Sequence, residues 1–115
     1  MLKFIFLLLV CSSSYADNWT SSDTKREIAY QTLAAVDWLQ TRNIARNPAY
    51  HEQNAVLGLH PSIGQVNNYF LITGLAHYLI ADYLTEWRRP FQWVTVGIEF
   101  GAIAHNFSIG ISARF

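Results

Sequence analysis

Two ionisable side chains lie near the middle of two apolar stretches, His77 in residues 66–84 and Glu99 in residues 91–111. Counted from the charged turn between the stretches, His77 lies about eleven residues before it and Glu99 about ten after it, which puts both about 16 Å away on helices. A carboxylate in apolar surroundings takes up a proton unless a partner stabilises its charge, and a facing imidazole is such a partner. We therefore predict that His77 and Glu99 face each other in contact.

Asp37 and His105 are further candidates for chemistry. Asp37 interrupts the apolar run of residues 33–39, and His105 follows Glu99 on the second stretch. Carboxyl and imidazole groups are the usual general acids and bases, so Asp37, His77, Glu99 and His105 are the candidate catalytic residues. As a functional site they would form a proton relay or a metal site. The alternative is a polar clamp that fixes how the helices pair, with Asp37 as an edge residue satisfied by its neighbours. Both readings stay open.

No metal site is predicted in the loop before the first apolar stretch. His51, Glu52 and His60 lie in the irregular segment 49–61, but their spacing matches no known zinc arrangement, and a solvated loop is favoured. The only cysteine, Cys11, falls in a segment that we expect to be removed, which leaves the mature chain without a disulfide or a cysteine nucleophile. The sequence names no cofactor.

Residues 1–16 have the three parts of a secretory signal peptide: Lys3, an apolar core at residues 4–10, and small residues at 14 and 16. We expect cleavage before Asp17. A lipoprotein acylated at Cys11 is the rival reading, disfavoured because Val10 stands where a small residue is usual.

The mature chain, residues 17–115, is expected to be one small helical domain. Thr24 and Glu27 form a capping box that predicts a helix to Arg46, where Asn47 and Pro48 stop it. Spacings of three and four put Tyr30, Leu33, Asp37, Gln40 or Thr41, and Ile44 on one stripe of this helix. The helix and a loop form an external part, residues 17–61.

Residues 62–115 are predicted to form a hydrophobic hairpin of two antiparallel helices. Ser62 and Gln65 form a capping box at its start, and both apolar stretches have the length of a membrane-spanning helix. Gly97 and Gly101 have the spacing that lets helices approach closely. The fold class is therefore all-α, one amphipathic helix plus a membrane-embedded hairpin.

The expected location is the inner membrane, with the N-terminal part in the periplasm. A cleaved signal places residues 17–65 outside the cytoplasm, and Arg88 and Arg89 in the connecting turn favour the cytoplasmic side for that turn. A soluble periplasmic helical bundle, with the same apolar runs as its core, is the alternative.

The composition favours a membrane protein or a protein with most of its residues buried. Hydrophobic residues make up 51% of the chain and charged residues only 14%, and the net charge is zero. Nucleic acid is not an expected partner, because it would need a basic excess.

Several segments resemble a family of short, signal-bearing proteins from bacteria and their phages. These segments are DWLQT (37–41), NAVLGLHPS (54–62), VNNYF (66–70), WRR (87–89), QWVTVGIE (92–99) and HNFSIG (105–110). A proline usually follows the asparagine at 54 in that family, where this chain has Ala55. The resemblance implies export and a shared architecture, and it implies no reaction.

We therefore expect a small exported membrane protein that acts through helix–helix contacts, with a homo-oligomer or an envelope protein as a possible partner besides the membrane. The alternative is an enzyme or carrier at the membrane, whose site would contain Asp37, His77, Glu99 and His105.

Overall fold

The computed structural model describes residues 19–52, 54 and 56–113, and these form three helices. They are α2 (Ser21–Arg46), α3 (Ile63–Tyr83) and α4 (Arg88–Ser108). The predicted all-α class is confirmed. The expected signal peptide, residues 1–16, lies outside the described residues.

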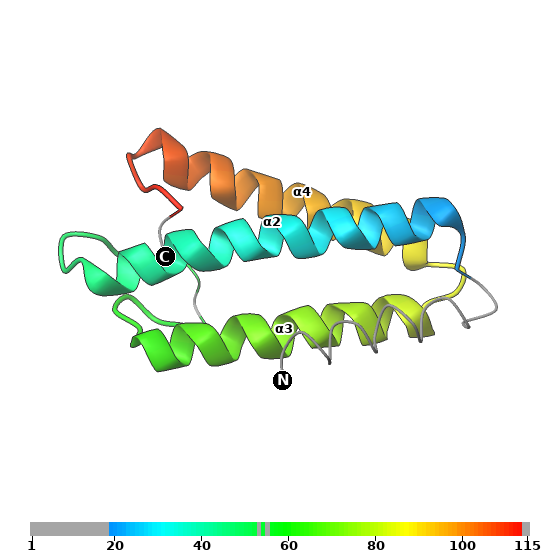
Figure 1. Cartoon of the computed structure of the whole chain (residues 1–115), viewed down its shortest axis with the longest axis horizontal. Helices are drawn as coiled ribbons and strands as arrows, with labels where there is room; N and C mark the ends of the chain where they lie inside the picture. Colours follow the sequence, from blue (N-terminus) through cyan, green and yellow to red (C-terminus); the bar gives the residue numbers. More distant parts are fainter. Residues whose placement is uncertain (1–18, 53, 55, 114–115) are drawn as a thin grey trace.

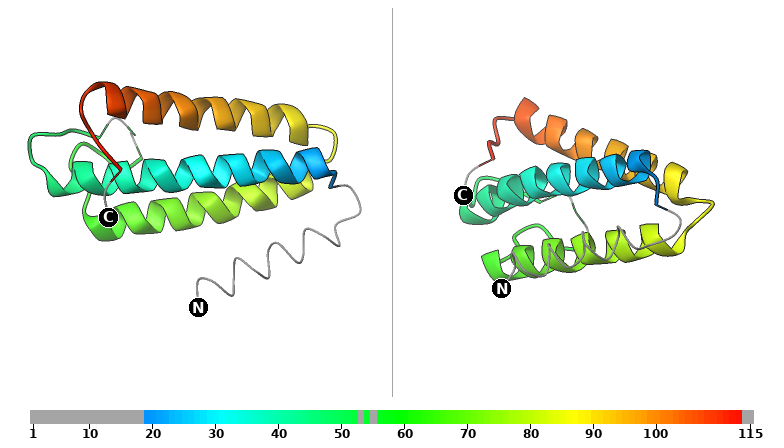
Figure 2. Two further views of the ribbon diagram at one scale, coloured as in Figure 1. Left: turned by 45° about the horizontal axis from the view of Figure 1, so that its top comes forward. Right: turned by 45° about the vertical axis from the view of Figure 1, so that its right-hand side comes forward.

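Helix α2 lies between α3 and α4 and packs against both (Figures 1 and 2), whereas α3 and α4 contact each other much less. The predicted close packing of the hairpin through its glycines is wrong, because a Cβ atom added at Gly97 or Gly101 would meet nothing within 4 Å. The close approach occurs instead at Gly74 of α3, whose carbonyl oxygen accepts a hydrogen bond of 2.9 Å from Gln31 Nε2 of α2.

The first turn of α2 differs from the predicted one. Thr20 Oγ1 accepts from the backbone N–H of Asp23 at 3.0 Å, and Asp23 Oδ2 accepts from the N–H of Thr20 at 3.0 Å. The capping box is therefore Thr20–Asp23 rather than Thr24–Glu27, and the Glu27 side chain is released to the interior. The predicted Ser62–Gln65 capping box of α3 and the end of α2 at Arg46 are both confirmed.

Arg88, the first residue of α4, is only 2% exposed. Its Nε donates to the carbonyl oxygen of Ala81 at 2.6 Å and its Nη2 to that of Asp82 at 3.1 Å. These carbonyls lie in the last turn of α3, where the helix itself supplies no donor. Arg88 Nη1 also donates to Asp23 Oδ2 at 3.2 Å, and the guanidinium lies 4.5 Å from the centre of the Trp19 ring. The prediction that Arg88 and Arg89 occupy the connecting turn is wrong, because both belong to the first turn of α4. Arg88 is buried there, whereas Arg89 is exposed.

The interior is unusually polar and the exterior unusually apolar. The buried polar and charged residues are Asp23, Glu27, Gln40, Thr41, His77, Arg88 and Gln92. The buried apolar residues are Tyr30, Ala34, Ile44, Val66, Phe70, Ala81, Ile103 and Ile111. Large apolar side chains on α3 and α4 are exposed instead, which reverses the usual distribution.

No helix within residues 19–113, as far as these are described, has the length and hydropathy of a membrane span, so the predicted spanning hairpin is not supported.

Replacing Arg88 by methionine should lower the free energy of unfolding by about 3 kcal/mol, because Asp23 loses a buried cation and the end of α3 loses two donors. The same change at exposed Arg89 should alter it by less than about 0.5 kcal/mol. Urea unfolding followed by far-UV circular dichroism measures both. Equal small losses would show that Arg88 does not stabilise the helix ends.

Candidate functional site

His77 lies at the centre of the three helices and is 4% exposed. Its Nδ1 lies 2.8 Å from Glu27 Oε2 of α2, and its Nε2 lies 2.7 Å from Thr95 Oγ1 of α4. One side chain of α3 therefore contacts a carboxylate on one neighbouring helix and a hydroxyl on the other.

Two aromatic rings stack on the imidazole of His77. The Tyr30 ring stacks on it with a centroid distance of 3.4 Å and an interplanar angle of 7°. The Phe91 ring stacks on it at 4.7 Å and 26°. Because α2 supplies Tyr30 and α4 supplies Phe91, the stacking joins the same three helices as the hydrogen bonds.

Glu27 is stabilised as a carboxylate. Burial raises the pKa of Glu27, but hydrogen bonds from His77, Gln31 and Gln92 lower it further than burial raises it, so the net pKa is lowered. Gln31 Nε2 donates to Glu27 Oε2 at 2.9 Å, and Gln92 Nε2 donates to Oε1 at 3.3 Å. An ionised Glu27 accepts a hydrogen bond from the Nδ1–H of His77, which fixes the orientation of the ring.

The Thr95 hydroxyl suits either protonation state of His77. Thr95 Oγ1 lies 2.9 Å from the carbonyl oxygen of Phe91 and 3.0 Å from that of Gln92. It donates to one of these carbonyls when Nε2 carries a proton, and it donates to Nε2 when Nε2 does not. Glu27, His77 and Thr95 thus have the order of a carboxylate–imidazole–hydroxyl triad, although the hydroxyl is half-buried and bonded within its own helix.

Asp37 and Glu99 form a second polar pair, between α2 and α4. Burial raises the pKa of Glu99 to about 8, and the neighbouring Asp37 carboxylate adds to the rise. Burial also raises the pKa of Asp37, while hydrogen bonds from Glu99 and Thr41 oppose that rise. Glu99 therefore keeps its proton near neutral pH and donates a hydrogen bond to the Asp37 carboxylate. Thr41 Oγ1 contributes a further bond to Asp37 Oδ1 at 3.3 Å.

The predicted pairing of His77 with Glu99 is wrong, because His77 contacts Glu27 and Thr95 while Glu99 contacts Asp37. The physical reason is that α2 lies between the other two helices and supplies a carboxylate to each of them. The side chain of His105 is exposed on α4.

Sequence reasoning missed four residues of this interior: Glu27, Arg88, Gln92 and Thr95. The sequence carries a signal for Glu27, because Asp23, Glu27 and Tyr30 follow one another at spacings of four and three, on the same side of the helix as the stripe that begins at Tyr30. Glu27 was assigned to a helix cap, a role that Asp23 performs instead.

The loop histidines form no metal cluster with other ligands. The rings of His51 and His60 meet edge to face at 5.1 Å. In the described part of the chain, no group of three or more His, Cys, Asp or Glu residues could hold a metal ion.

Comparison with family models, with curated proteins and with solved structures finds no match for this chain. The resemblance to short signal-bearing proteins of bacteria and phages stays a prediction.

A double-mutant cycle tests the partner of His77. Glu27→Leu and His77→Leu should each cost about 3 kcal/mol, because each leaves a buried polar group unpaired. The double variant should cost less than the sum by about 1–3 kcal/mol. In the control cycle, Glu99→Leu and His77→Leu should add to within about 0.5 kcal/mol, because these residues share no contact. If only the control cycle showed a coupling energy, the result would support contact between His77 and Glu99 and contradict contact between His77 and Glu27. Denaturant unfolding supplies all the values.

The Asp37–Glu99 pair predicts a pH dependence. Because the pKa of Glu99 is raised on folding from 4.5 to about 8, its neutral form stabilises the fold fully below pH 4.5, and this contribution is lost as the pH rises to about 8. The denaturant concentration at the unfolding midpoint should decrease as the pH is raised from 5 to 8.5. The decrease should be smaller in Glu99→Gln, because glutamine cannot ionise. An identical pH profile for the two chains would contradict the shared proton.

Proposed function

We propose that this chain is a small exported protein that associates with a membrane through the outer sides of α3 and α4 and acts by helix–helix contact rather than by catalysis. The observation that carries the proposal is the reversed distribution of polar and apolar side chains.

Most of the exposed apolar residues of α3 and α4 lie on the outer half of their helix. We call Leu71, Ile72, Leu75, Leu79 and Tyr83 the α3 face. We call Trp93, Val94, Ile98, Phe100 and Phe107 the α4 face. Ile72 is 66% exposed, and Ile98 and Phe100 are each 64% exposed. On α3, spacings of one, three and four put the members of the set on one side of the helix. On α4 the set covers about half of the circumference: Trp93, Phe100 and Phe107 recur at spacings of seven along one edge, and Val94 and Ile98, four residues apart, lie along the other.

Such faces favour contact with lipid or with another helix. Exposed apolar patches on monomeric soluble proteins are small, and larger ones mark interaction sites. Gly97 and Gly101 lie amid the α4 face with open space around them, which gives a second helix room for close backbone approach. A homo-oligomer or an envelope protein would supply that helix.

The polar interior supports a clamp rather than an active site. Glu27, His77 and Thr95 satisfy one another across the three helices, and Arg88 satisfies the end of α3. Polar contacts of this kind specify one arrangement of helices, because any other leaves a buried group without its partner.

The proposed location is the inner membrane, with the N-terminal part in the periplasm. The support is the signal-peptide pattern of residues 1–16. N-terminal sequencing of the purified protein should begin at Asp17.

Vesicle flotation tests the proposal. The purified chain should float with phosphatidylcholine vesicles. Leu75→Ser with Leu79→Ser on the α3 face should weaken vesicle binding more than tenfold, because each leucine is about half exposed and its burial contributes about 1 kcal/mol. The control Ile28→Ser removes an exposed apolar residue from α2, outside both faces, and should leave flotation nearly unchanged. A wild-type chain that stays in the aqueous fraction as a monomer would support the soluble periplasmic bundle instead.

A membrane enzyme or carrier is the second candidate, and one observation favours it. Glu99 Oε2 is buried with no hydrogen-bond partner among the described residues, and the pKa of Glu99 is raised to about 8, as in groups that exchange protons near neutral pH. The double variant His77→Ala with Glu99→Ala tests this candidate. If cells that carry it at normal protein levels behave like wild type, a site built from Asp37, His77, Glu99 and His105 is eliminated.

A further inference from the structure

A shallow groove runs between α2 and α4 near the first turns of both helices. Its volume is about 300 Å³, and it is lined by Ser22, Lys25, Arg26, Ala29, Trp93 and Val96. The α2 wall carries two cations and a hydroxyl, whereas the α4 wall is apolar. A ligand that fills this groove must therefore combine an anionic group with hydrocarbon.

The charge that faces outward from the first two turns of α2 is positive. Lys25 is exposed and makes no hydrogen bond or ion pair with the other described residues. Arg26 is held in place by Asp23 and by a 2.9 Å bond from its Nε to Gln92 Oε1. The acids of this stretch, Asp23 and Glu27, are buried and contact interior partners. The first turns of α2 and α4 add the positive ends of two helix dipoles.

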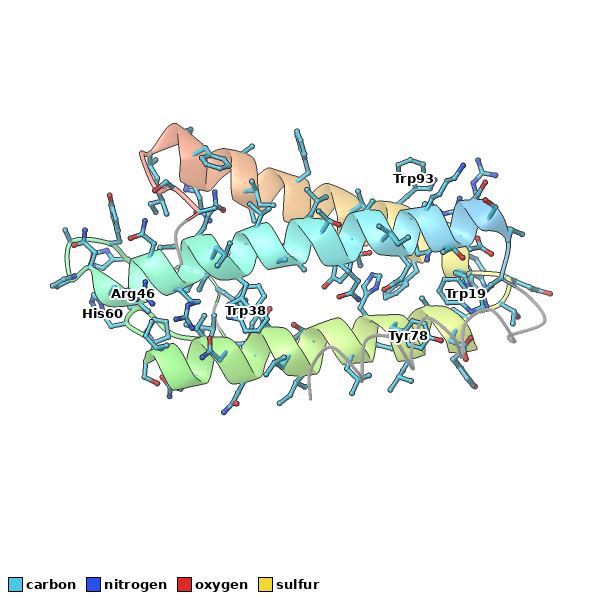
Figure 3. The ribbon with its side chains drawn as sticks, viewed as in Figure 1. Trp19, Trp38, Arg46, His60, Tyr78 and Trp93 are labelled. Atoms are coloured by element: carbon cyan, nitrogen blue, oxygen red, sulfur yellow. The ribbon has the colours of Figure 1, made fainter. Side chains whose placement is uncertain are left out.

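The apolar wall of the groove continues into the α4 face. Trp93 lines the groove, is 57% exposed and projects from the outer side of α4, as Figure 3 shows. Tryptophan favours the boundary between lipid headgroups and acyl chains, where its ring is buried and its N–H stays hydrated. Phe100, which is 64% exposed and lies seven residues after Trp93 on the same side of α4, offers an apolar surface to an acyl chain.

We infer that the groove between Lys25 and Arg26 on α2 and Trp93 on α4 binds the phosphate headgroup of an anionic phospholipid, with an acyl chain along the α4 face. The inference rests on the proposed membrane association and names its lipid. Free phosphate would match the cations and leave the apolar wall unused. The groove is at the small end of ligand pockets, which fits a headgroup and the start of a chain rather than a whole lipid.

The test measures binding of the full purified chain to two kinds of vesicle, phosphatidylcholine alone and phosphatidylcholine mixed with phosphatidylglycerol. Binding to the anionic vesicles should be tighter, and this preference should weaken as salt rises. Lys25→Gln should reduce the preference about fivefold, the usual effect of one cation near an anionic surface. It should leave binding to neutral vesicles unchanged.

Arg46→Gln is the matched control, because it removes one positive charge from the other end of α2, away from Trp93 (Figure 3). It should leave the preference within about twofold of wild type. Trp93→Ser should weaken binding to both kinds of vesicle, since it removes the ring shared by the groove and the α4 face.

The outcomes separate this inference from the proposed function. Equal binding to both vesicles, or a Lys25→Gln variant that keeps the full preference, overturns the lipid site and leaves membrane association standing. A chain that binds neither kind of vesicle overturns both the lipid site and the proposed membrane association. Displacement of the chain from anionic vesicles by inorganic phosphate, at an ionic strength matched with chloride, would show that the groove binds free phosphate and would also overturn the lipid assignment.

Discussion

The contact between Glu27 and His77 constrains the rest of this structure. Both side chains are buried, and each would be costly in an apolar interior without the other. Because Glu27 belongs to α2 and His77 to α3, the pair holds these two helices in one register. Thr95 and Phe91 then bring α4 to the same imidazole, so that one ring is bonded or stacked against all three helices.

Arg88 imposes a second constraint at the end of the molecule. The chain turns sharply between α3 and α4, and the last carbonyls of α3 need donors there. The Arg88 guanidinium supplies them, bonds to Asp23 at the start of α2 and lies over Trp19. Trp19 also stacks on Tyr78 at 5.7 Å, at the same end of the molecule (Figure 3). The Arg88 guanidinium therefore joins the end of α3, the start of α2 and Trp19 at this end of the molecule.

The two constraints together explain the apolar exterior. Three helices of this length offer limited interior space, and here polar side chains occupy much of it. The Leu, Ile and Phe side chains of α3 and α4 are consequently turned outward, where water does not favour them. A molecule built in this way gains from lipid or a partner helix on those faces. The outward-facing cations beside Trp93 place a polar headgroup site at the edge of the same surface.

The sequence by itself determined the helices, because their signals are local. The Ser62–Gln65 capping box, the stop at Asn47 and Pro48, and the long apolar stretches each act within a few residues, and α2 and α3 end or begin where these signals indicate. Only the tertiary structure decided the polar partners. Counting along a hairpin placed Glu99 opposite His77, but α2 lies between those helices, so that Glu27 pairs with His77 and Asp37 with Glu99. Partner choice depends on which helix lies between the others, and packing of the whole chain fixes that order.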